Sequence, residues 1–139
     1  MSQENIGYLL KQLSDRLSAV ADASLREHGL TFSQLRVLEF IHRQGGEVTQ
    51  KEIEDFLAVA HPTVVGLVCR LEKKGFLRCR VDETDRRNKR VSLSESAYAL
   101  QEIMMQERLE MEAHLSKGFS QEELAQLRIF FRRLYQNME

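Results

Sequence analysis

Basic residues gather in one short segment of this 139-residue chain. Between Arg70 and Arg90, nine lysines and arginines stand against four acidic residues, a formal charge of +5. The rest of the chain holds eleven basic and seventeen acidic residues, a charge of −6, so the total is only −1. An acidic body with one basic segment can present a single face to a polyanion such as nucleic acid. The segment is therefore the first candidate binding site, and a solvated charged hairpin is the alternative interpretation.

The triplet Asp85-Arg86-Arg87 lies between two runs in which apolar and polar residues alternate. Such alternation is typical of strands, so the segment predicts a β-hairpin with a charged tip. A lone hairpin is only marginally stable, and we expect it to pack on helices. The phase of alternation places Leu77, Cys79, Val81, Val91 and Leu93 toward the core and Arg78, Arg80 and Arg90 outward.

Two helices are expected just before the hairpin. Thr49 and Glu52 form a capping-box pattern that starts a short helix, and Gly75 ends the next one. Between them, His61 stands at the expected N-cap and Pro62 at the first helical position, where its missing N–H has no partner to lose. Two helices joined by so short a turn predict a helix-turn-helix, whose second helix is the candidate reader of the DNA major groove.

Binding to DNA needs donors toward phosphates for affinity and toward base edges for specificity. We expect His61, Thr63 and Val64 to approach bases, and Gly66 to let the backbone come close to DNA. Arg70, one turn further on, could reach a phosphate or a guanine, or form a structural salt bridge instead. The candidate contacts are His61, Pro62, Thr63, Val64, Gly66 and Arg70 in the helix and Asp85, Arg86, Arg87, Lys89 and Arg90 in the hairpin.

The sequence pattern near both ends of the chain predicts long helices. Apolar spacing indicates a helix from Ile6 to about His28, and Thr31 with Gln34 starts another that ends at Gly45-Gly46. After a long helical segment up to Leu115, the final helix carries three consecutive bulky groups, residues 129–131, which span too wide an arc for one buried face. We therefore expect a dimer held by the terminal helices. The candidate dimer residues are Leu9, Leu13, Leu127, Phe130, Phe131 and Leu134.

Several classes of protein are disfavoured by the sequence. It has no glycine-rich phosphate loop, nucleophile elbow or paired carboxylates that would indicate an enzyme, and it implies no cofactor. No apolar run approaches the roughly 18 residues of a membrane span, and no signal peptide is apparent. With only two cysteines, a single reduced, cytoplasmic domain is expected. The remaining alternative of another class is a winged helix that binds protein rather than DNA, which the basic segment disfavours.

The order of helices and hairpin resembles the MarR family of bacterial transcriptional regulators over nearly the whole chain. The family's hairpin motif reads Asp-x-Arg, five residues, then Leu-Thr. Here Asp85-Arg86-Arg87 is followed by residues 88–92 and Leu93-Ser94, with serine in place of the last threonine. Residues 67–76 are similar to the end of the family's recognition helix. The start of that helix departs from the usual Ser-Thr-Val-Thr-Arg, because glycine stands at position 66 where an arginine is common.

This resemblance implies a mainly α-helical fold with a small β-hairpin wing. A winged helix-turn-helix lobe would span about residues 31–95, and dimerisation helices about 1–28 and 96–139. It implies a homodimeric repressor that binds a palindromic operator in double-stranded DNA. An Asp85–Arg87 pair would stiffen the wing while Arg86 or Arg87 enters the minor groove.

Members of such a family typically respond to a signal, and the resemblance implies a small aromatic or phenolic effector. Zinc is an alternative, since Glu110 and His114 share a helix and His28 and His42 end two others. An oxidant is another, since Cys79 lies between Arg78 and Arg80. For Cys79, and equally for Cys69, a small buried apolar residue is the interpretation that the sequence favours.

Overall fold

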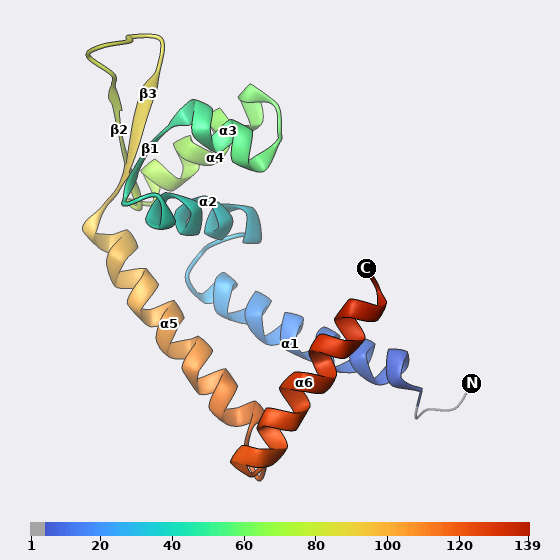
Figure 1. Ribbon diagram of the computed structural model, residues 1–139. Coiled ribbons are helices and arrows are strands. Elements are labelled where there is room, and N and C mark those ends of the chain that lie inside the picture. Colours follow the sequence, from blue (N-terminus) through green and yellow to red (C-terminus); the bar gives the residue numbers. More distant parts are fainter. Residues whose placement is uncertain (1–4) are drawn as a thin grey trace. The chain divides into compact units, whose positions relative to one another are not determined.

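The computed structural model describes residues 5–139, so residues 1–4 of the first expected dimer segment lie outside the described part. The chain divides into two compact units, Met1–Tyr98 and Ala99–Glu139. The first contains most of the secondary structure, and the second contains most of one long helix and all of the last (Figure 1). In order, the elements are α1 Ile6–Glu27, α2 Phe32–Arg43, β1 Glu47–Thr49, α3 Gln50–Leu57, α4 His61–Lys73, β2 Leu77–Val81, β3 Lys89–Leu93, α5 Glu95–Leu115 and α6 Gln121–Asn137.

Most helix ends fall where local sequence predicted them. The reciprocal capping boxes of Thr31 with Gln34 and of Ser120 with Glu123 are both formed. At α3, the Thr49 hydroxyl accepts a hydrogen bond from the backbone N–H of Glu52 at 3.1 Å. Gly75, with φ of +84°, follows the end of α4 as predicted.

The predicted start of α4 is wrong by one residue. Ala60 is the N-cap, and its carbonyl accepts from the backbone N–H of Thr63 at 3.0 Å. His61 and Pro62 are therefore the first two helical residues, where Pro62 still has no N–H to leave unpaired. The His61 ring does not cap the helix, because it is paired with Glu54 of α3.

A third strand, which the sequence did not predict, joins the hairpin to the helices. The sheet has the order β1-β3-β2 and is antiparallel throughout. Val91 of β3 lies opposite both Val48 of β1 and Cys79 of β2, and Val91 and Val48 are fully buried. At three residues, β1 is too short to show an alternation in the sequence.

The far end of the hairpin is less buried than its alternation predicted. Leu77 is buried and Cys79 half-buried, but Val81 is 53% exposed, because it pairs with Lys89 at the end furthest from the core. Conversely, Arg90 was expected to point outward and is half-buried, since its guanidinium pairs with Asp82 at 3.4 Å.

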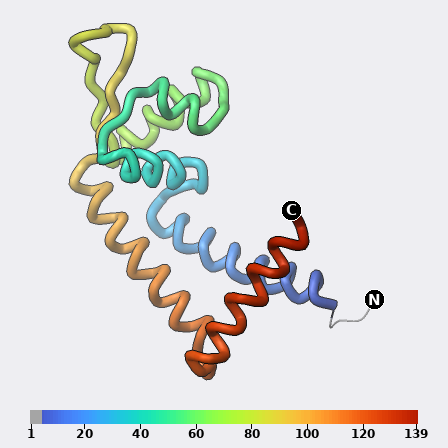
Figure 2. Tube along the Cα trace, in the orientation of Figure 1, coloured from blue at the N-terminus to red at the C-terminus, as the bar shows by residue number. Residues whose placement is uncertain are grey.

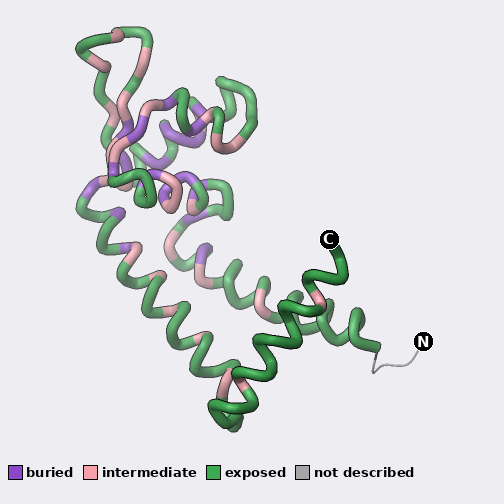
Figure 3. Tube along the Cα trace, in the orientation of Figure 1, coloured by how far each residue is buried: buried purple, intermediate pink, exposed green. Residues whose placement is uncertain are grey.

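The core of the first unit lies among α2, α3, α4 and the sheet, where the buried residues of Figure 3 gather. The prediction that Val64 faces outward is wrong, because its side chain is 0% exposed. Val64 begins the series completed by Leu67, Val68 and Leu71, the spacing of one buried helix face. The next residue, Val65, is exposed instead.

The terminal helices carry large apolar side chains that the single chain leaves open. Leu25 is the one fully buried residue of α1, and α6 has none. Of the candidate dimer residues, Leu9, Leu13, Leu127, Phe130 and Phe131 are exposed and Leu134 is half-buried. Among the described residues, no helix is both long and apolar enough to cross a membrane.

Gly46 is a position where both the backbone and a neighbouring side chain favour glycine. Its φ is +103°, and a Cβ there would lie 2.4 Å from the hydroxyl of Tyr98. Replacing Gly46 with alanine should lower the free energy of unfolding by about 3 kcal/mol, which urea titration followed by circular dichroism would measure. Gly45→Ala is the matched control, because its φ is +97° but nothing lies within 4 Å of its Cβ position. An equal loss in the two variants would show that the tyrosine contact is unimportant.

Candidate nucleic-acid interface

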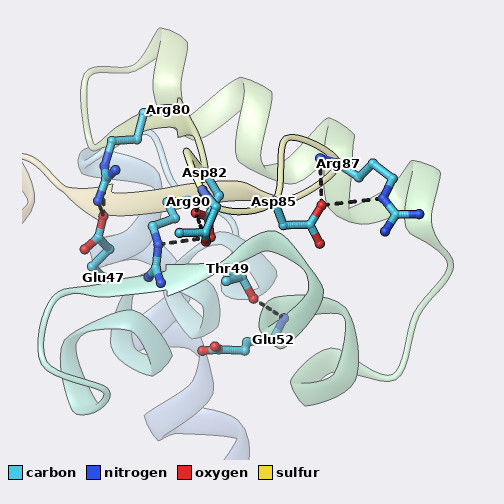
Figure 4. A network of polar contacts seen from close by, with 9 residues as sticks. Glu47, Thr49, Glu52, Arg80, Asp82, Asp85, Arg87 and Arg90 are labelled. Carbon is cyan, nitrogen blue, oxygen red and sulfur yellow. Dashed lines mark hydrogen bonds and ion pairs between the residues drawn. The ribbon is translucent and has the colours of Figure 1, made fainter.

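Ion pairs and hydrogen bonds fix the shape of the wing, defined here as β2, β3 and residues 82–88 between them (Figure 4). A carboxylate oxygen of Asp85 accepts a hydrogen bond from the backbone N–H of Arg87 at 3.1 Å. The same oxygen lies 3.5 Å from the Nε atom of Arg87. Asp82 accepts from the backbone N–H and hydroxyl of Thr84 at 2.9 and 2.7 Å. These bonds to Thr84, followed by the charge of Arg90, hold the pKa of Asp82 below its usual value. The wing tip is thus a structured turn.

Only some of the basic residues between Arg70 and Arg90 form ion pairs or hydrogen bonds within the protein. Lys74, Arg80, Arg87 and Arg90 have polar partners, and for Arg80 the partner is Glu47 at 2.9 Å. Even so, the Arg87 side chain is 94% exposed. Within residues 5–139, no ion pair or side-chain hydrogen bond is found for Arg70, Lys73, Arg78, Arg86 or Lys89. Most of the cations thus remain available to an anionic partner.

A groove of about 330 Å³ joins the helix-turn-helix to the wing. Figure 2 shows the chain running from α4 through the wing and into α5. The groove brings together His61, Arg87 and Lys89, which the sequence had placed on two separate elements. It is lined by Gln50, Lys51, Glu54, His61, Val65, Arg87, Asn88 and Lys89.

Five of these eight residues, Gln50, Lys51, Glu54, Val65 and Asn88, were not among the sequence candidates. Glu54 lies seven positions before His61, on the other side of the turn, and no local pattern links two such positions. Val65 was missed because Val64, which is buried, was expected to face outward in its place.

The other candidate DNA contacts of α4 are divided between its exposed side and its buried side. Pro62 and Thr63 are exposed, as the interface requires, whereas the buried Val64 offers no side chain to a partner. The Arg70 guanidinium folds back over Gly66, with Nη1 3.6 Å from where a Cβ would be. That is an ordinary contact distance, so the fold does not itself require glycine at position 66. The structural salt bridge considered for Arg70 does not occur within residues 5–139.

Lys74 stabilises the fold through hydrogen bonds within the protein and is therefore not one of the available cations. Its ammonium donates to the backbone carbonyl of Gly29 and to the Gln34 side chain, the latter at 3.0 Å. Gln34 is itself buried and completes the capping box of α2. The C-terminal end of α4 is thereby tied to the turn between α1 and α2.

The two cysteines differ in surroundings and in the expected reactivity. Burial, then a hydrogen bond and charge repulsion from Glu72, raise the pKa of Cys79 to about 11. Its thiolate is therefore scarce, which disfavours Cys79 as an oxidant sensor. Cys69 was expected to be buried, but it lies on the outer side of α4 and is exposed.

Iodoacetamide at about pH 8 should alkylate Cys69 at least tenfold faster than Cys79, because the thiolate is the nucleophile and only about one part in a thousand of Cys79 is ionised there. Mass spectrometry of peptides from a time course measures both rates. Raising the pH toward 11 should accelerate the reaction of Cys79. Equal rates at pH 8 would contradict the shielding of Cys79 and support oxidant sensing.

The zinc alternative requires several metal-binding side chains to lie together. Among residues 5–139, no group of three or more histidine, cysteine or acidic side chains is placed to hold a metal ion.

Comparisons with known proteins agree with this architecture. A profile of the MarR family matches residues 28–88. The HTH-type transcriptional regulator YwoH of Bacillus subtilis (strain 168), described as uncharacterized, is 33% identical over 127 residues, which cover 91% of this chain and 91% of YwoH. The HTH-type transcriptional regulator PecS of Dickeya dadantii (strain 3937) is 25% identical over 131 residues, covering 93% of this chain and 79% of PecS.

Among solved structures, the S. aureus MepR–DNA complex has a TM-score of 0.83 and 30% sequence identity, covering 96% of this chain and 99% of MepR. The resemblance noted from the sequence and the expected mainly helical fold with its wing are confirmed. The named relatives are regulators of transcription rather than enzymes. The chain therefore belongs to the MarR family of winged helix-turn-helix transcriptional regulators.

Proposed function

We propose that this protein is a repressor that binds a palindromic operator in double-stranded DNA as a homodimer, with α4 in the major groove and the wing on the adjacent minor groove. The observation that carries the proposal is the groove lined by α3, α4 and the wing together, because one duplex could then contact helix and wing at once. A DNA complex of the similar protein MepR supports it.

The proposed DNA contacts are divided between α4 and the wing. His61, Pro62 and Thr63 at the start of α4 approach base edges, and Arg70 reaches a phosphate or guanine one turn later. In the wing, Lys89 and Arg86 neutralise phosphates, while Asp85 orients Arg87 toward the narrow minor groove. We assign the minor-groove role to Arg87 because it is the wing arginine held by Asp85 and its side chain is 94% exposed. Arg90, held by Asp82, is assigned to keeping the wing in shape.

The homodimer is proposed from the open apolar faces of the terminal helices. Phe130 and Phe131 are 49% and 41% exposed, and Leu9 and Leu13 of α1 are 48% and 42% exposed. Covering such faces removes apolar area from water at about 25 cal/mol per Å². We assign dimerisation to residues 1–28 and 96–139 and DNA binding to a lobe of about residues 31–95. The resulting two-fold symmetry calls for a palindromic site.

Selection from random duplexes at low salt tests the proposal. It should recover a near-palindromic site whose half-sites are about 10 bp apart. Affinity for the recovered duplex, measured by fluorescence anisotropy, should fall at least about 100-fold between roughly 50 and 200 mM salt, because phosphate contacts release counterions. If no sequence is enriched, the protein does not act as a sequence-specific regulator.

Effector control is part of the proposal through family membership. A small aromatic or phenolic effector would change DNA affinity by binding one state of the dimer more tightly than the other. Thermal-shift screening of aromatic acids, with zinc and peroxide in parallel, separates the three classes of signal, because a ligand that binds the folded state raises its melting temperature. A shift with zinc alone would exclude the aromatic effector.

A further inference from the structure

Glu54 of α3 and His61 of α4 form a pair within the groove that faces the proposed DNA. The Nδ1 atom of His61 is hydrogen-bonded to one carboxylate oxygen of Glu54. The other oxygen lies 4.0 Å from the ammonium of Lys51. The Glu54 side chain is only 14% exposed, whereas that of His61 is 65% exposed. The carboxylate is therefore held within the protein, and the imidazole is open to a partner.

This pairing decides what the other nitrogen of His61 can do. A carboxylate can only accept, so the ring must carry its proton on Nδ1. In the neutral ring, Nε2 is then a hydrogen-bond acceptor. Within residues 5–139, His61 has no partner other than Glu54, so Nε2 is free to meet a base.

The major-groove edges of the bases differ in what they offer such an acceptor. Adenine presents an N6 amino donor and cytosine an N4 amino donor, whereas guanine presents only acceptors and thymine an acceptor and a methyl group. An acceptor at Nε2 therefore favours adenine or cytosine. A His61 free to place its proton on Nε2 would not discriminate in this way.

We infer that Glu54 is a positioning residue for base recognition: by holding the proton of the neutral His61 ring on Nδ1, it makes Nε2 of that ring an acceptor that selects adenine or cytosine at one position of each half-site. The inference rests on the proposed DNA binding by α4. It adds a residue from α3, outside the reading helix, to the determinants of sequence preference. The other charged groups of the groove, Lys51, Arg87 and Lys89, are donors and do not compete for the Nδ1 proton.

Selection from random duplexes with the wild type, Glu54→Gln and His61→Ala tests this inference. The glutamine amide can either accept from or donate to Nδ1, so both tautomers become available. In both variants, the preference for adenine or cytosine at the same position should fall about fivefold. The base preferences at the other positions of the site should remain. Asp55→Asn is the matched control, because Asp55 also pairs with Lys51, at 3.4 Å, but within residues 5–139 forms no hydrogen bond or ion pair with His61. It should retain the wild-type preference.

Long-range proton–nitrogen NMR spectra of the imidazoles supply a readout that a merely structural role would not change. His61, assigned by its absence in His61→Ala, should be protonated on Nδ1 in the wild type and shift toward the Nε2 tautomer in Glu54→Gln. If the wild type enriches no sequence, the proposed function fails. If it enriches a site that His61→Ala and Glu54→Gln leave unchanged, only the present inference is overturned. A preference for guanine at that position would mean that Nε2 donates, which also overturns it.

Discussion

Changing Arg86 and Arg87 together to alanine should weaken binding to the selected duplex by at least about 100-fold without altering the melting temperature of the protein. Both side chains are exposed, and Arg87 is 94% exposed despite its contact with Asp85, so the fold gains little from either. A lost contact to DNA costs about 1 kcal/mol or more, so the two lost from each subunit, four in a dimer, give a loss of at least about 100-fold. Fluorescence anisotropy at fixed salt measures it.

Single variants separate the two arginines. Arg87→Ala should account for most of the loss, and Arg86→Ala should reduce affinity similarly for all sequences, as a phosphate contact does. The double variant Arg36→Ala/Arg43→Ala is the matched control, because it removes the same charge from exposed positions of α2, which the proposal uses neither for DNA contacts nor for the dimer. If the wing variant binds as tightly as the control, the wing has no part in DNA binding.

Replacing Phe130 and Phe131 together with serine should convert the proposed dimer into monomers. The two rings are about half exposed and α6 has no buried residue, so the proposal assigns their burial to a second subunit. Affinity for a palindromic duplex should then fall by about 100-fold or more, because the second half-site is no longer bound by a linked subunit. Light scattering after size exclusion gives the mass, and anisotropy gives the affinity.

The Phe32→Ser variant controls for the loss of an exposed aromatic side chain. Phe32 is 65% exposed on α2, outside the proposed dimer residues, and its replacement should leave the mass unchanged. Circular dichroism should remain helical in both cases. A Phe130→Ser/Phe131→Ser protein that still has the mass of a dimer would mean that α6 is not the interface.

The sequence was most informative where a local interaction decides the structure. Capping pairs such as Thr31 with Gln34, and the left-handed Gly75 after α4, depend on neighbouring residues alone, and these helix ends were predicted correctly. The same holds for the turn that contains Asp85 and Arg87, two residues apart.

Features that depend on distant residues were missed or misplaced. Strand β1 exists because Val48 pairs with Val91, more than forty residues away. Val64 was placed outside because nothing in α4 itself says which apolar stripe meets the core, and Val81 was placed inside because alternation does not say where the core ends. The contact of Glu54 with His61 crosses the turn between two helices, so sequence patterns identified the histidine but not the residue that orients it.

Hydroxyl-radical footprinting of the selected duplex tests most directly whether helix α4 and the wing bind DNA together in a dimer. The account predicts two symmetric protected regions about 10 bp apart, each with a flanking protected stretch across the minor groove. In the Arg86→Ala/Arg87→Ala variant, at concentrations that restore binding, the flanking stretches alone should disappear. A single unsymmetric footprint, or flanking protection that survives in the variant, would contradict the account.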